Sequence, residues 1–266
     1  MKQYEIIDAH CHIYPDKIAE KASQSTGKFY DLPVEYDGKI STLHRTSKDA
    51  GISHCIVQSV ATKPEQVSSI NRFIAESVAN SDGFMTGLGT LHPESENIVA
   101  EVDEIISLGL RGVKLHPDIQ GFKIDDYRCL KIYELCEGRL PILMHTGDNR
   151  FDFSNPNRLS PVLDIYKKLT VIAAHFGGYT MWDDAKELLP KYENAYVDCS
   201  SCFFLMTDEE ILDAINTFGE DHVLFGTDFP MWKPVPEIER LLSLGLSDSV
   251  YEKIFFKNAK KVFGIK

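Results

Sequence analysis

Histidines recur in this sequence directly after short apolar runs, where parallel strands would end. Six of the nine histidines do so: His10, His12, His92, His116, His145 and His175. Asp228 follows a further apolar run, in Gly226-Thr227-Asp228-Phe229-Pro230. Imidazole and carboxylate groups are the common protein ligands of zinc and similar divalent ions, which activate water. The pattern therefore predicts a metal-dependent reaction centre.

The spacing of His10 and His12 predicts that they act together. In a strand the side chains at positions i and i+2 point to the same side, so these two imidazoles aim at one point. Cys11 lies between them and points the opposite way, which predicts a packing role. His145, His175 and Asp228 follow three other expected strands. Three imidazoles and one carboxylate can hold a divalent ion and leave a position for water.

Alternating patterns predict the elements that must position these residues. Short apolar runs flanked by turn residues predict eight strands, at residues 4–9, 55–60, 84–91, 112–116, 141–145, 170–175, 195–199 and 223–227. Helical spacing predicts helices at residues 40–50, 64–81, 97–108, 127–137, 160–168, 181–192, 208–218, 235–244 and 247–256. Ser160-Pro161 would place a proline in a first helical turn.

Eight strand-helix pairs in 266 residues predict an α/β fold, a (β/α)8 TIM barrel formed by residues 1–266 as a single domain. Strand ends would then converge on the catalytic face of the barrel. A doubly wound open sheet is the alternative, but that fold usually has a glycine-rich turn after its first strand. Here the first strand ends in Asp8-Ala9-His10-Cys11-His12. Residues 13–39 are predicted to be a long irregular segment over the mouth of the barrel.

The composition excludes several classes of protein. The chain has 28 Lys and Arg against 40 Asp and Glu, and its net charge of −12 disfavours binding to nucleic acid or to anionic membranes. No apolar run suits a membrane span and the first residues lack a signal-peptide core, which predicts a cytoplasmic protein. The six scattered cysteines are expected to be reduced thiols, and the Cys199 and Cys202 pair lacks a second pair for zinc.

Five segments in this order resemble the amidohydrolase superfamily, and within it the amidohydrolase-related branch that includes aminocarboxymuconate semialdehyde decarboxylase. They are the His-x-His of His10 and His12, Gly112-Val113-Lys114-Leu115-His116-Pro117, Met144-His145-Thr146, Ala174-His175-Phe176-Gly177-Gly178 and Gly226-Thr227-Asp228-Phe229-Pro230. Asn258-Ala259 near the C-terminus also resembles this branch. The resemblance covers nearly the whole chain.

The resemblance implies a role for each of these residues. His10, His12, His145 and Asp228 would bind the metal, which is expected to be one zinc ion, with manganese or cobalt as alternatives. Asp228 would also be the base that takes a proton from water. His175 would orient the water or stabilise the developing negative charge. Asp228 and His175 are therefore the expected catalytic residues.

Lys114 and His116 share one face of the expected fourth strand. Binuclear members of the superfamily carry a carboxylated lysine on this strand, so Lys114 is the candidate for a carbamate that bridges two metal ions. His116 lies nearer the strand end, and in this branch both residues more often line the substrate pocket. A mononuclear centre, with His116 binding substrate, is therefore expected.

Hydrolysis of a small amide, ester or lactone is the expected reaction, because it is the commonest chemistry of the superfamily. The alternative is non-oxidative decarboxylation of an unsaturated or aromatic acid, for which Arg150 would hold the carboxylate. Trp232 would offer an aromatic wall to a flat small-molecule substrate. A homodimer is compatible with this branch. A barrel that binds metal without turnover is the remaining alternative.

Overall fold

Parallel strands form the centre of the structure. The computed structural model describes residues 4–266. Its strands are β1 (Ile7–His12), β2 (His54–Gln58), β3 (Met85–Gly87), β4 (Gly89–Thr90), β5 (Val113–Leu115), β6 (Ile142–Met144), β7 (Val171–Ala173), β8 (Ala195–Asp198) and β9 (Val223–Leu224). They pair in sequence order, β1 to β3 in one sheet and β4 to β9 in another, and each pair is parallel.

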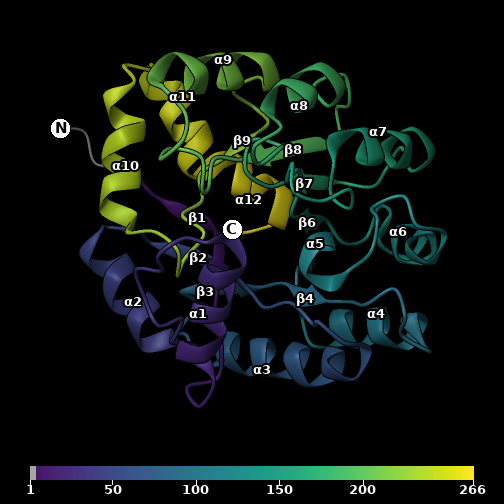
Figure 1. Ribbon diagram of the computed structural model, residues 1–266. Helices are drawn as coiled ribbons and strands as arrows, with labels where there is room; N and C mark the ends of the chain where they lie inside the picture. The colour runs from purple at the N-terminus through teal and green to yellow at the C-terminus, as the bar shows by residue number, and fades with distance from the viewer. Residues whose placement is uncertain (1–3) are drawn as a thin grey trace.

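Backbone hydrogen bonds join the two sheets into one ring. β3 and β4 are two halves of the strand expected at residues 84–91, and Leu88 between them donates its N–H to Val57 O at 2.9 Å. At the other junction, Ala9 N–H donates to Phe225 O at 2.9 Å. Eight strands thus close on one another, and the helices surround them (Figure 1). The predicted (β/α)8 barrel is confirmed.

The helices that cover the barrel lie mainly between successive strands. They are α1 (Ala19–Tyr30), α2 (Ile40–Asp49), α3 (Val67–Ala79), α4 (Ile98–Ser107), α5 (Pro117–Gln120), α6 (Leu130–Cys136), α7 (Pro156–Ile165), α8 (Trp182–Leu188), α9 (Asp208–Phe218), α10 (Pro234–Ser243), α11 (Asp248–Glu252) and α12 (Asn258–Phe263). Further helical turns are η1 (Pro64–Gln66), η2 (Tyr127–Cys129) and η3 (Lys253–Lys257). Within residues 4–266, no helix combines the length and apolarity that crossing a membrane requires.

α1 shows that the prediction of an irregular segment at residues 13–39 is wrong. The buried residues of this helix are Ala19, Ser23 and Gly27. These side chains are too small and too polar to form the apolar stripe by which a surface helix is detected in a sequence. The segment does lie at the mouth of the barrel, as expected, because α1 lines the central cavity described below.

Two element boundaries also differ from the sequence predictions. β1 continues to His12 instead of ending at residue 9, because Cys11 and His12 still pair with Val57 and Gln58 of β2. α7 begins at Pro156, so Pro161 lies inside the helix instead of in its first turn. Pro156 takes the helix-starting place that the sequence analysis gave to Pro161.

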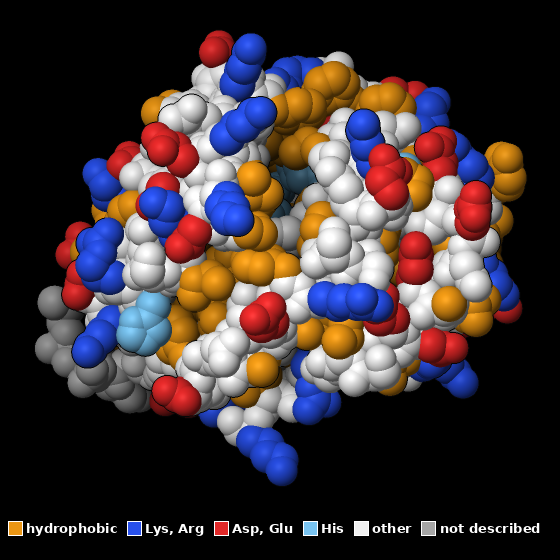
Figure 2. All heavy atoms as spheres, turned by 90° about the horizontal axis from the view of Figure 1, so that it is seen from below, with side chains coloured by type: hydrophobic (Ala, Val, Ile, Leu, Met, Phe, Trp, Pro, Cys, Tyr) orange, Lys and Arg blue, Asp and Glu red, His pale blue; other side chains and the backbone are white. Residues whose placement is uncertain are grey.

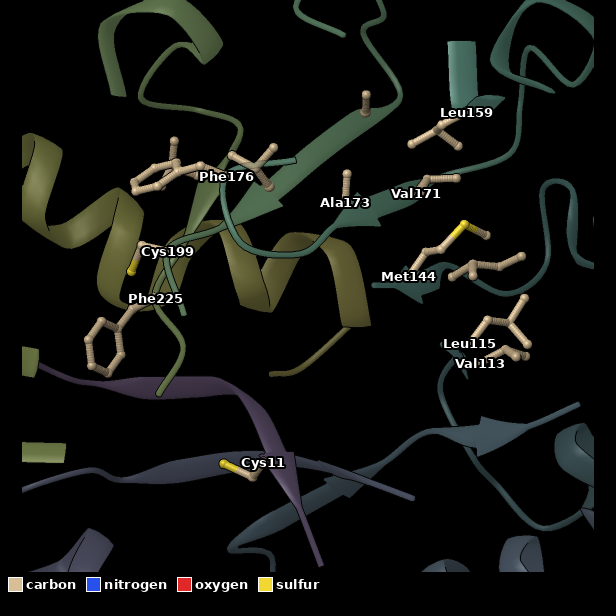
Figure 3. Packing of buried hydrophobic residues seen from close by; sticks show 14 of the residues in the cluster. Cys11, Val113, Leu115, Met144, Leu159, Val171, Ala173, Phe176, Cys199 and Phe225 are labelled. Atoms are coloured by element: carbon tan, nitrogen blue, oxygen red, sulfur yellow. The ribbon is translucent and has the colours of Figure 1, made fainter. Parts of the chain in front are cut away.

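Alternation along the strands divides the buried apolar residues into two clusters. The interior cluster lies inside the ring of strands and consists of Ile7, Ala9, Ile56, Leu88, Leu143, Ile172, Ala174, Tyr196 and Leu224, with Ala259 and Phe263 of α12 packed against them. The outer cluster lies between strands and helices. Figure 3 shows part of it, with Met144 and Val171 of neighbouring strands near Leu159 of α7. Side chains on the inner face beyond the interior cluster meet at the carboxyl ends of the strands.

Gly147, shortly after β6, lies where the loops at these strand ends pack closely against one another. A Cβ atom on Gly147 would lie 2.6 Å from Gly178 Cα, whereas one on Gly121 would meet nothing within 4 Å. The two glycines have φ of 76° and 77°, so alanine suffers similar backbone strain at both. We expect Gly147→Ala to lower the free energy of unfolding in urea by about 2 kcal/mol more than Gly121→Ala does. Equal losses would contradict the close approach to Gly178.

Candidate metal centre and active site

A cavity of about 520 Å³ opens at the carboxyl ends of the strands. The polar residues at its inner end are His10, His12, Lys114, His116, His145, His175 and Asp228. Figure 2 shows a hollow in the surface with histidine side chains at its bottom. The structure therefore brings together seven of the predicted site residues, from β1, β5 and the segments that follow β5, β6, β7 and β9.

A bulge in β1 turns both of its histidines toward the cavity. Ala9 lies in the interior cluster, so a regular strand would place Cys11 there as well. The register with β2 shifts between Asp8 and Cys11, and Cys11 packs in the outer cluster. His10 and His12 then share the inner face, with their Nε2 atoms 3.2 Å apart. Cys11 has the packing role that the sequence predicts.

Asp198, the last residue of β8, determines which nitrogen of His10 faces the cavity. Its Oδ2 lies 2.9 Å from His10 Nδ1, and its Oδ1 accepts from the His175 N–H at 3.1 Å and from Ser200 Oγ at 2.5 Å. Burial alone would raise the pKa of the Asp198 carboxyl, but His10 and these hydrogen bonds hold it below its usual value. The carboxylate therefore keeps a proton on His10 Nδ1 and leaves the Nε2 lone pair directed into the cavity.

Asp228 faces the same two imidazoles. Its Oδ1 lies 3.4 Å from His10 Nε2 and 3.5 Å from His12 Nε2. Ser201 Oγ donates to its Oδ2 at 2.6 Å and accepts from Trp232 Nε1 at 2.8 Å. The backbone of Asp228 is left-handed, with φ of 58°, which costs about 1–2 kcal/mol for a residue other than glycine. The hydrogen bonds from Trp232 to Ser201 and from Ser201 to Asp228 help to hold the carboxylate in place on this strained backbone.

His175 and His145 meet through their ring nitrogens. His175 Nδ1 donates to the carbonyl oxygen of Ser200 at 2.9 Å, so Nε2 of the neutral ring carries no proton. This Nε2 lies 3.0 Å from His145 Nδ1. The other nitrogen of His145, Nε2, lies 3.4 Å from Asp118 Oδ2. Burial lowers the pKa of both histidines, which keeps the rings neutral and able to act as ligands or hydrogen-bond acceptors.

Tyr30, the last residue of α1, places a hydroxyl group at the cavity. Ile119 N–H donates to His116 Nδ1 at 3.3 Å, so the neutral ring of His116 carries its proton on Nε2 and donates it to Tyr30 Oη at 2.7 Å. The Tyr30 hydroxyl can then donate its own proton to a substrate oxygen or to His145, which is 3.5 Å away. Burial raises the pKa of Tyr30 well above its usual value and keeps the hydroxyl protonated.

Lys114 points from β5 toward the histidines. Its Nζ lies 3.0 Å from His10 Nε2, and only 1% of the residue is exposed. Burial lowers the pKa of Lys114 to about 8, a direction that favours the neutral amine. Of the described residues that line the cavity, Lys114 is the one lysine or arginine.

The structure does not bring Arg150 and Trp232 into the lining of this cavity. The guanidinium of Arg150 pairs with Asp148 at 2.7 Å, donates to the carbonyl oxygen of Phe29 at 2.8 Å and lies 5.2 Å from the ring centre of Tyr30. Its charge is therefore used within the protein. Trp232 contributes to the site indirectly, because it donates to Ser201, which in turn donates to the carboxylate of Asp228.

The donor set at the inner end of the cavity fits a divalent metal ion. The ligand atoms of His10, His12 and Asp228 all lie within 4.8 Å of one another. Their separations of 3.2, 3.4 and 3.5 Å are close to the distance of about 3.3 Å between two ligands of a tetrahedral zinc ion. His145 belongs to a second such group, with His116 and Asp118. Both groups consist of imidazole and carboxylate side chains, which divalent transition metals prefer as ligands.

Asp118, Asp198 and Tyr30 belong to the site but were not predicted from the sequence. Asp198 ends an apolar strand, as several of the predicted histidines do, so the same strand-end rule would have found it. Tyr30 ends a helix whose buried face carries only small residues. No sequence pattern places its hydroxyl group beside His116, because that contact depends on how α1 crosses the mouth of the barrel.

TIM-barrel enzymes carry their reactive groups at the carboxyl ends of the barrel strands. The closed barrel of this protein, with histidines and carboxylates on that face, belongs to this class. The chain belongs to the amidohydrolase family, whose model (Amidohydro_2, described as Amidohydrolase) matches residues 7–265. The family predicted from the strand-end motifs is thereby confirmed. Among curated protein sequences, no match to this chain is found.

Solved structures share the fold at low sequence identity. An uncharacterised TIM-barrel protein from Bordetella bronchiseptica has a TM-score of 0.82 at 21% identity, over 98% of this chain and 99% of that one. A candidate 2-pyrone-4,6-dicarboxylic acid hydrolase from Pseudomonas putida has a TM-score of 0.70 at 18% identity, over 100% of this chain and 99% of that one. A dihydroxybenzoic acid decarboxylase from Polaromonas sp. JS666, with bound manganese and an inhibitor, has a TM-score of 0.72 at 16% identity, over 98% of this chain and 97% of that one. Identities this low establish the fold alone.

Removal of one imidazole tests the metal centre. We expect the purified protein to contain about one equivalent of divalent metal per chain, and His10→Ala to retain less than about a tenth of it. His44→Ala is the matched control, because His44 is exposed and does not line this cavity. Elemental analysis of protein purified without chelators or immobilised metal measures the content. Equal metal in His10→Ala and in the unaltered protein would contradict the assignment.

Glu237 of α10 is a buried carboxyl group near the site. Its Oε2 has no hydrogen-bond partner among the described residues. Burial, with Asp8 and Asp228 nearby, raises the pKa of Glu237 from 4.5 to about 7. Between these two values the unfolded chain has released the proton and the folded protein still binds it, so the free energy of unfolding falls as pH rises.

Glu237→Gln removes this pH dependence, because glutamine is neutral at every pH. We expect the variant to be more stable than the unaltered protein, by a small amount at pH 5 and by on the order of 2 kcal/mol at pH 8. Urea unfolding at the two pH values measures the difference. Glu239→Gln, an exposed position on the same helix, serves as the control and is expected to show no such trend. A gain that does not grow with pH would show that Glu237 is ionised in the folded protein.

Proposed function

We propose that the protein is a metal-dependent hydrolase that acts on a small amide, ester or lactone. The observation that carries this proposal is the make-up of the cavity. Its inner end contains the histidines and Asp228, and no arginine of the described chain lines it. Arg150, which was expected to hold a substrate carboxylate, is paired with Asp148 instead. Because carboxylates are commonly bound by guanidinium groups, this cavity suits an uncharged carbonyl compound better.

His10, His12 and Asp228 would hold one divalent metal ion. We assign His145 to the same set through Nδ1, because Asp118 faces its Nε2 in the way that Asp198 faces the Nδ1 of His10. A divalent ion would polarise the substrate carbonyl and lower the pKa of water. Zinc suits a set of imidazoles with one carboxylate, and manganese is the alternative. In this mononuclear arrangement Lys114 carries no carbamate.

The protein residues supply the proton transfers and the orientation. Asp228 would accept a proton from water as the new carbon–oxygen bond forms, and would return it to the oxygen or nitrogen that leaves. His175 would orient that water, because its unprotonated Nε2 can only accept a hydrogen bond. Tyr30 and Lys114 line the cavity as donors and would stabilise the carbonyl oxygen as it gains negative charge.

Decarboxylation of an unsaturated or aromatic acid is the second candidate reaction. The ammonium of Lys114 and the hydroxyl of Tyr30 both line the cavity and could together bind one carboxylate group. The Polaromonas structure with the same fold is that of a dihydroxybenzoic acid decarboxylase. Hydrolysis consumes water and decarboxylation releases carbon dioxide, so product analysis separates the two reactions.

A panel of lactones, amides, esters and aromatic acids in water enriched in oxygen-18 tests the proposal. We expect acid products that carry one atom of the heavy isotope, with no release of carbon dioxide. His175→Ala is expected to keep its metal and to lower kcat by about 100-fold or more, whereas His44→Ala leaves kcat unchanged. Release of carbon dioxide from an acid, without uptake of oxygen-18 into the product, would contradict hydrolysis and support decarboxylation. Full activity of His175→Ala would refute the role given to that residue.

A further inference from the structure

We infer that the substrate carries its reacting carbonyl on an uncharged apolar body, which binds in a chamber between α1 and α3. This apolar chamber is the part of the cavity lined by Ile18, Ala22, Phe29, Val60, Ile70 and Phe73. The inference rests on the proposed hydrolase function for the reacting end of the substrate. The nature of the other end follows from the chamber itself.

One face of α1 forms the first wall of the apolar chamber. Ala22, Thr26 and Phe29 line the cavity at spacings of four and three residues, which puts them on one side of the helix. Gly27, on the neighbouring face, allows α1 to lie close to the segment that follows it, because a Cβ there would be 2.7 Å from Leu32 O. The wall is therefore held in place by close backbone packing.

The first half of α3 forms a second wall. Ser69, Ile70 and Phe73 line the cavity at spacings of one and three residues, and Val60 joins them from the segment after β2. A neighbouring face of α3 is buried in the outer cluster, and Ile70 and Phe73 also pack against that cluster, so the helix cannot turn these side chains away. Both α1 and α3 lie in the lower half of Figure 1. The polar groups between the two walls are hydroxyl and amide groups, which carry no charge.

Charge is confined to the histidine end of the cavity. Apart from the histidines, Lys114 and Asp228 are the ionisable charged side chains among the described lining residues, and both lie at that end. The guanidinium of Arg150 lies 5.2 Å from the ring centre of Phe29, but it already forms an ion pair with Asp148. A carboxylate on the body of the substrate would lose its hydration in the chamber without gaining a partner. An uncharged body would instead gain from contact with Phe29 and Phe73.

Three amides of known size and charge test the inference: acetamide, hexanamide and the monoamide of adipic acid. Hexanamide and the adipic monoamide have the same chain length, and only the second has a terminal carboxylate. We expect hexanamide to bind about tenfold or more tightly than either of the others, as measured by isothermal titration calorimetry on the purified metal-containing protein. Equal binding of acetamide and hexanamide, tighter binding of the adipic monoamide, or no measurable binding of hexanamide would each overturn the inference.

An arginine placed in the chamber tests where the apolar body lies. Ile70→Arg is expected to reduce the preference for hexanamide over the adipic monoamide by about tenfold or more. Ile18→Arg provides a second variant that leaves the core intact, because Ile18 is 52% exposed at the rim of the cavity. Ile106→Arg, at an exposed position on α4 outside the cavity, is the matched control. An unchanged preference in both cavity variants would place the substrate elsewhere and contradict the inference.

The same titrations separate this inference from the proposed function. Binding gives heat that saturates, whereas hydrolysis gives a continuous heat signal and a new acid product. Saturable binding with the expected preferences but without hydrolysis of any amide, ester or lactone would refute the hydrolase function and leave the apolar chamber supported. Hydrolysis that is equally fast with and without the terminal carboxylate, together with equal binding, would refute the chamber and leave the hydrolase function supported.

Discussion

The buried carboxylate of Asp198 is the interaction on which the site depends. It accepts hydrogen bonds from the ring of His10 on β1, from the backbone of His175 after β7 and from Ser200, two residues beyond the end of β8. Three strand ends are thereby joined through one charged group. An ionised carboxylate can be buried only when its hydrogen-bonding capacity is filled, so these contacts support one another. The direction of the His10 lone pair, and with it the proposed metal centre, follows from this network.

The barrel and α1 supply different parts of the cavity. The strand ends supply the imidazoles and carboxylates of the inner end, whereas α1 and α3 supply the apolar walls farther out. A helix at the mouth can change in sequence without disturbing the hydrogen bonds among the strand ends. This separation explains how one barrel can combine a constant reaction centre with different substrates.

Much of the fold could be predicted because each element has its own period in the sequence. Apolar runs and helical spacing are local properties, and they located the eight barrel strands and most helices. α1 was missed because its buried face consists of Ala19, Ser23 and Gly27. The bulge in β1 was also hidden, since a shift in register depends on pairing with β2. The strand-end histidines were found, whereas the grouping of His145 with His116 and Asp118 needed coordinates.

The barrel, the family and the position of reactive residues at strand ends could all be predicted from the sequence, because periodicity and short motifs reside in neighbouring residues. The tertiary structure was needed for the proton position on His10, the pairing of Arg150 with Asp148 and the contact of Tyr30 with His116. It also decided that α1 and α3 enclose an uncharged chamber. Most of these features depend on contacts between segments far apart in the chain, and their energies depend on burial, which no local pattern contains.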